Sequence, residues 1–135
     1  MRNFNHSVNV LVKAYLNNWL IHRKCTACAV GNLISEGNPE EYDFYQGRWY
    51  SWFRSLGLNS MDPDFRDYDH PDVIKTGYSP SELISIERAF ERCDRGCNED
   101  DYMFNGLMAV VDVLAEIHGV DLTQKETAKA LFVKL

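Results

Sequence analysis

The stretch NEDDYMFNGLMAVVDVLAEIHG, residues 98–119, decides the fold of this chain. Its large apolar residues recur every three or four positions, which is the spacing of one face of an α-helix. This face contains Met103, Leu107, Val110, Leu114 and Ile117. Asn98 with Asp101 can cap the start of the helix, and Gly119 provides a stop. We therefore expect a long central helix against which the rest of the chain packs.

The segment that precedes this helix carries three agreeing signals of a helix start. Ser79 supplies a hydroxyl cap, Pro80 suits the first helical position, and Glu82 can complete a capping box. The sequence therefore predicts a helix that begins at residue 80. Its buried face is expected to contain Leu83, Ile86 and Phe90.

Helices are also expected at both ends of the chain. Apolar residues recur at helical spacing from Val8 to Leu20, and Asn5 or Ser7 can cap this helix. At the other end, Thr123 opens a second capping-box pattern and a short last helix. The inner face of that helix is expected to contain Ala128, Leu131 and Phe132.

The middle of the chain is less regular. Thr26 can cap a short helix that reaches Ile34, and the aromatic spacing from Tyr45 to Leu56 predicts a third helix. Residues 58–77 contain two prolines, many aspartates and no apolar period, so we expect a long acidic loop there. The sequence thus predicts an all-α fold: a compact bundle of five or six helices with one long acidic loop.

Length and composition set limits on the class of protein. A chain of 135 residues is one domain by size, so residues 1–135 are expected to form a single helical domain. The net charge is −6 and no dense cluster of Lys and Arg is present, which argues against nucleic-acid binding. No apolar run approaches the length of a membrane span and no secretory signal is visible, so we expect a cytoplasmic protein without membrane attachment.

Two cysteine pairs are the first candidate for a chemical site. Cys25 and Cys28 are separated by two residues, and Cys93 and Cys97 by three. Four thiolates can hold Zn²⁺ in a tetrahedral site, so these residues are a candidate structural metal centre. Small buried hydrophobic side chains are the alternative reading, because unpaired cysteines are usually buried.

A redox dithiol is a second reading of the first pair. If the segment after Cys25 begins a helix, the helix N-terminus and the neighbouring Arg23 and Lys24 would lower a thiol pKa. Cys25 would then be the attacking thiol. Thioredoxin-type motifs follow a β-strand, however, whereas a helix precedes this pair.

The acidic loop offers a third candidate. Residues 62–72 contain five aspartates and His70, which could bind a cation or small ligand through oxygen atoms. The spacing does not fit an EF-hand. A solvated acidic loop explains the same residues.

The aromatic segment around residue 50 is a candidate interaction surface. Trp49, Tyr50, Trp52 and Phe53 exceed what one helix face can bury, and two arginines are interleaved with this aromatic run. Exposed Trp, Tyr and Arg are the residues that protein interfaces favour. Packing against the long loop is the alternative reading.

Three segments carry a resemblance to a known family. They are CTACAVGNL at 25–33, GYSPSELISIERAF at 77–90 and FNGLMAVV at 104–111. Together they resemble a family of small bacterial proteins with a CxxCAVGN turn and an FNGL helix, whose members often carry the name of the NADH-oxidising component of the sodium-translocating NADH-quinone reductase. That component needs a flavin domain and a ferredoxin-like set of four closely spaced cysteines, neither of which fits this chain. The resemblance implies a common fold and an important CxxCAVGN turn, but no reaction.

The sequence as a whole favours a small non-enzymatic helical protein that acts through protein–protein interaction, with no cofactor or with Zn²⁺ bound by cysteines. The partner can be another protein or a second copy of the chain. A thiol redox protein that uses Cys25 and Cys28 is the first alternative, and ligand or cation binding at residues 62–72 is the second.

Overall fold

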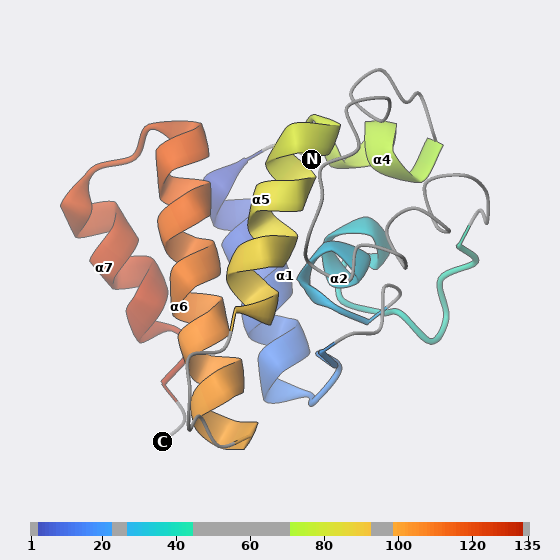
Figure 1. Cartoon of the computed structure of the whole chain (residues 1–135), viewed down its shortest axis with the longest axis horizontal. Coiled ribbons are helices and arrows are strands. Elements are labelled where there is room, and N and C mark those ends of the chain that lie inside the picture. The colour runs from blue at the N-terminus through green and yellow to red at the C-terminus, as the bar shows by residue number, and fades with distance from the viewer. Residues whose placement is uncertain (1–2, 23–26, 45–70, 93–98, 134–135) are drawn as a thin grey trace.

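The structure is a computed structural model that describes residues 3–22, 27–44, 71–92 and 99–133 (Figure 1). Over these ranges the chain forms six helices and no strand. The helices are α1 (Phe4–Leu16), α2 (Ala29–Ser35), α4 (Pro71–Thr76), α5 (Pro80–Glu91), α6 (Glu99–His118) and α7 (Leu122–Ala130). The all-α helical bundle predicted from the sequence is confirmed.

The helix pair α5 and α6 forms the centre of the bundle. In Figure 1 the two helices run side by side, α7 covers the outer side of α6, and α1 lies behind α5. The short helices α2 and α4 pack together, and α2 also contacts α1 and α5. Fully buried side chains from α1, α2, α5 and α6 meet in one apolar core that includes Leu11, Ile34, Phe90 and Leu107.

Gly106 allows α5 and α6 to approach closely. A Cβ atom at this position would lie 2.5 Å from the backbone oxygen of Phe90. No side chain fits in that space, because real Cβ contacts are longer than 3.0 Å. The glycine of the Phe-Asn-Gly-Leu segment is therefore a helix-packing residue.

Two helix starts agree with the sequence, and others do not. The capping box of Ser79 and Glu82 is present at the start of α5, as predicted. The prediction for α1 was wrong by one turn, because the N-cap is Asn3, whose Oδ1 accepts the backbone N–H of His6 at 3.1 Å. That earlier start brings Phe4 into the helix, where its ring is buried.

The ends of α1 and the start of α2 also differ from the expectation. α1 stops at Leu16, and Asn18 has a left-handed backbone with φ of 59°. Leu20 follows this turn and is still buried, so its apolar signal came from tertiary packing and not from the helix. α2 begins after Cys28, which replaces Thr26 as the cap.

The last helix has the predicted position but not the predicted cap. Asp121 caps α7 by accepting the N–H of Gln124 at 2.8 Å, so the cap predicted at Thr123 was wrong. Ala128 and Phe132 are buried as expected. Leu131 is 48% exposed, which contradicts its predicted inner position.

Part of the expected acidic loop is helical. Residues 71–76 form α4, which begins at a proline, the residue that suits the first turn of a helix. The remainder of that loop and the helix predicted from Tyr45 to Leu56 lie outside the described residues. Among the helices that are described, none has the length and apolar character needed to cross a membrane.

Candidate functional site

The CxxCAVGN turn forms the start of α2. Cys28 carries a reduced thiol, is fully buried, and caps the helix through its Sγ, which accepts the N–H of Gly31 at 3.4 Å. A cysteine is an unusual helix cap, since the residues that prefer this position offer oxygen. The sulfur of Cys28 is thereby held at a fixed point in the core.

Asn32 ties the turn to the end of α1. Its side-chain nitrogen lies 3.1 Å from the carbonyl oxygen of Trp19, and 3.0 Å from those of Ala27 and Cys28. The backbone N–H of Ile21 also donates to Ala27 O at 2.8 Å. The two ends of the segment that contains Cys25 are therefore held together, although Cys25 itself lies outside the described residues.

Two glutamates of α5 are buried beside this turn. Glu87 and Glu91 are only 7% and 5% exposed. Glu87 accepts hydrogen bonds from the Cys28 thiol and from the backbone N–H of Val30, and its carboxyl group also bonds to that of Glu91. We call Cys28, Glu87 and Glu91 the thiol–carboxylate cluster.

Burial changes the protonation of the cluster. Loss of hydration, together with the negative charge of Glu91, raises the pKa of Glu87 to about 8. Burial first, and then the charge of Glu87, raises the pKa of the Cys28 thiol well above its usual range. At neutral pH the cluster therefore holds protons on both Cys28 and Glu87.

One oxygen of the cluster is left without a partner. Oε2 of Glu87 is buried and forms no hydrogen bond with any described residue. A buried carboxyl oxygen without a partner costs free energy, roughly 1–3 kcal/mol for an ordinary polar group and more for a charge. Strongly perturbed and incompletely satisfied acids of this kind are concentrated at functional sites.

An aromatic stack borders the cluster. The His22 ring lies between Phe90 and Tyr102, with ring centres 4.3 and 3.6 Å away. Nε2 of His22 donates to the backbone oxygen of Phe90 at 3.1 Å, and the Tyr102 hydroxyl donates to the backbone oxygen of Glu91 at 2.7 Å. The stack closes the cluster on the side of α6.

The four-cysteine metal centre predicted from the sequence is represented here by Cys28 alone. Cys25, Cys93 and Cys97 lie outside the described residues. Within the described ranges, no three His, Cys, Asp or Glu side chains are grouped as ligands of a metal ion would be. The four-cysteine site stays a prediction.

The redox interpretation requires an activated thiol, and Cys28 has the opposite character. Its burial and raised pKa keep it protonated, whereas reactive cysteines are accessible and have lowered pKa values. The proposed attacking thiol, Cys25, lies outside the described residues.

The other two candidates fall mostly outside the described chain. Of residues 62–72 only the last two are described, and there Asp72 is buried and accepts the hydroxyl of Tyr42 at 2.7 Å. The predicted interaction residues Trp49, Tyr50, Trp52 and Phe53 lie outside it entirely. Both stay predictions.

Sequence reasoning missed the two glutamates, although a signal was present. Glu87 and Glu91 fall four residues apart on the same stripe of α5 as Leu83 and Phe90. Acidic residues on the apolar stripe of an amphipathic helix are buried when the helix packs. Their positions alone indicated buried carboxylates.

Comparisons with protein-family models, with curated proteins and with solved structures give no match to this chain. The family resemblance of the CxxCAVGN and FNGL segments therefore rests on those residues alone.

Proposed function

We propose that this chain is a non-enzymatic helical protein that binds a thiophilic divalent metal ion, Zn²⁺, at the CxxCAVGN turn. Cys25 and Cys28 supply sulfur ligands and Glu87 supplies a carboxylate oxygen. The observation that carries the proposal is the contact of the Cys28 thiol with a buried carboxyl group whose Oε2 has no partner among the described residues.

The chemistry of these groups supports a metal better than it supports an empty core. Zn²⁺ takes thiolate and carboxylate ligands together, and it would replace the protons that Cys28 and Glu87 hold when metal is absent. A bound cation also offsets the cost of burying two carboxyl groups in contact, since their mutual repulsion is part of what raises the pKa of Glu87.

The chain connection supports Cys25 as a partner of Cys28. Only two residues separate them, and the bond between Ile21 and Ala27 holds the ends of that segment together. Two cysteines at this spacing are common ligands of one zinc ion.

The test is elemental analysis of the purified protein, prepared without chelators, together with a count of titratable thiols. We expect one zinc per chain, and we expect Cys28→Ala and Glu87→Gln each to lower the zinc affinity by about tenfold or more. Glu126→Gln, which removes an exposed carboxylate on α7, is the matched control and should bind as the wild type does.

A double variant decides between the two donor sets. If Cys25, Cys28 and Glu87 are the ligands, Cys93→Ser with Cys97→Ser retains zinc. Loss of zinc in that variant would overturn this donor set in favour of four cysteines. A metal-free protein with four titratable thiols, and no zinc uptake on titration, would overturn metal binding altogether.

A further inference from the structure

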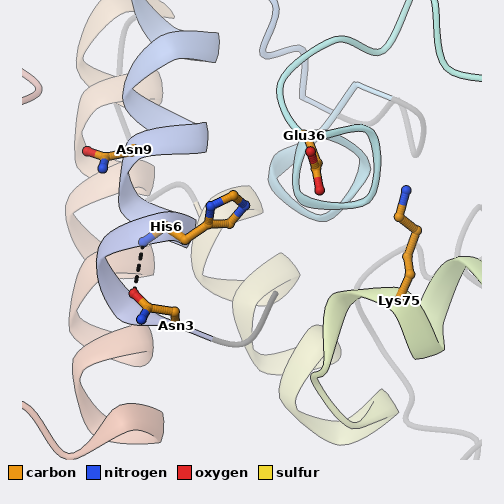
Figure 2. A pocket seen from close by; sticks show the side chains of 5 residues that line it. All are labelled: Asn3, His6, Asn9, Glu36 and Lys75. Atoms are coloured by element: carbon orange, nitrogen blue, oxygen red, sulfur yellow. Dashed lines mark hydrogen bonds between the residues drawn. The ribbon is translucent and has the colours of Figure 1, made fainter.

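A second candidate site lies at the opposite end of α2 from the thiol–carboxylate cluster and does not depend on the proposed metal. It is an open pocket of about 570 Å³ where the start of α1, the end of α2 and the short helix α4 come together. Its lining residues are Asn3, His6, Asn9, Glu36 and Lys75. All five are exposed and polar, and two carry opposite charges. Figure 2 shows Glu36 projecting into the opening with His6 and Lys75 on either side of it.

The positive side of the pocket is held in place by an aromatic ring. Nζ of Lys75 lies 4.4 Å from the centre of the Tyr42 ring, close enough for a cation–π interaction. Tyr42 is fixed in turn by the hydrogen bond from its hydroxyl to the buried Asp72 of α4. The ammonium group is thus positioned without forming an ion pair to any described carboxylate.

The negative side is held in place by a helix end. Glu36 caps α2 in the left-handed conformation, with φ of 57°, and its backbone N–H bonds to Asn32 O. Gly37 follows directly, and a Cβ there would lie 3.4 Å from the backbone oxygen of Val10, so this turn is packed against α1. The carboxylate of Glu36 also has no ion pair or hydrogen bond with the described residues.

Two opposite charges that share a pocket without pairing offer complementary sites for one ligand that carries both. Lys75 and the positive N-terminal end of the 13-residue helix α1 favour a carboxylate, and Glu36 favours an ammonium group. The exposed imidazole of His6 and the amide of Asn9 add hydrogen-bonding groups. The volume falls within the range of ordinary small-molecule sites.

We propose that this pocket binds a free α-amino acid, with its carboxylate toward Lys75 and its ammonium group toward Glu36. A zwitterion satisfies both charges at once, whereas a simple anion would leave Glu36 unpaired and a simple cation would leave Lys75 unpaired.

The test is a nuclear magnetic resonance titration of the full chain, in which backbone amide signals are followed as ligand is added at millimolar concentrations. The probes are L-alanine, L-glutamine and L-phenylalanine, each compared with propionate, which lacks the ammonium group, and ethylamine, which lacks the carboxylate. We expect saturable shifts at residues 3, 6, 36 and 75 with at least one amino acid, and affinities lower by about tenfold or more for the two single-charge compounds.

Matched variants separate specific binding from a general charge effect. Glu36→Gln and Lys75→Gln should each weaken amino-acid binding by about tenfold or more, while the exposed-site controls Glu126→Gln and Arg88→Gln should not. The proposal is overturned if none of the three amino acids shifts these signals, if propionate or ethylamine binds as tightly, or if the pocket variants bind as the controls do.

Discussion

The thiol of Cys28 and the carboxyl group of Glu87 meet in the dry interior, between the first turn of α2 and the middle of α5. Each group raises the cost of ionising the other, because a negative charge on either would face a second charge in a medium of low polarity. The pair therefore resists ionisation unless a cation joins it. This relationship determines how the protein should respond to pH, to thiol reagents and to substitution.

The first prediction concerns the pH dependence of stability in the metal-free protein. The Glu87 carboxyl group ionises near pH 4.5 in the unfolded chain, but only near pH 8 in the folded chain. Between these values the unfolded chain binds fewer protons, so the free energy of unfolding should fall as pH rises, by up to about 1.4 kcal/mol per pH unit. Urea denaturation with chelator present measures it.

Glu87→Gln provides the comparison for that experiment. The amide cannot ionise, so the variant should lack this fall and should gain stability relative to the wild type as pH increases to 8. Glu126→Gln, on the surface of α7, should follow the wild type. Parallel curves for the wild type and Glu87→Gln would show that Glu87 is not the titrating group.

The second prediction concerns the reactivity of Cys28 in the same metal-free protein. A fully buried thiol with a raised pKa should react with iodoacetamide only when the protein opens, so its labelling rate should follow stability and not simple thiol ionisation. Mass spectrometry of tryptic peptides measures the rate at this residue, and a denatured sample gives the unprotected rate. Rapid labelling in the native state would contradict the burial.

The third prediction concerns Asn32, whose amide group contacts three backbone carbonyl oxygens around the CxxCAVGN turn. Asn32→Ala should lower the free energy of unfolding by about 2–3 kcal/mol, because it leaves buried carbonyl groups without donors. Asn38→Ala is a matched control, since its amide bonds only to the exposed Glu41. Equal effects of the two substitutions would show that the contacts of Asn32 contribute little.

The fourth prediction concerns the closest approach of α5 and α6. Gly106→Ala places a methyl group where the backbone oxygen of Phe90 already lies, so the helices must separate. We expect a loss of about 1–3 kcal/mol even though alanine favours helix formation. Gly119→Ala is a useful contrast, because its added carbon contacts nothing within 4 Å and any cost comes from its φ of 65°.

Much of the helical fold could be predicted because local and tertiary preferences agree in the long segments. The stripe of α6 and the capping box of α5 depend on residues three and four positions apart, and such patterns can be read directly. The errors fall at helix ends. Asn3 and Asp121 act as caps one or two residues before the positions expected, because several polar residues compete for each cap and packing selects among them.

The candidate site was only half predictable. Cys28 was identified from its spacing to Cys25, whereas Glu87 belongs to a helix nearly sixty residues later, and no local pattern indicates that the two side chains touch. The same is true of the pocket, which joins Glu36 to His6 and Lys75 from separate helices. Contacts of this kind follow from tertiary packing, which a single sequence does not specify.

The proton held by Glu87 also alters how the protein migrates in an electric field. The formal net charge of −6 counts every glutamate as ionised. Near the sequence isoelectric point of about 5.1, the folded chain carries Glu87 in its neutral form, as it would carry a glutamine there. The wild type and Glu87→Gln should therefore focus at the same position in a native gel and separate in a gel that contains urea. A single substitution of an acidic residue would thus be electrically silent until the protein unfolds.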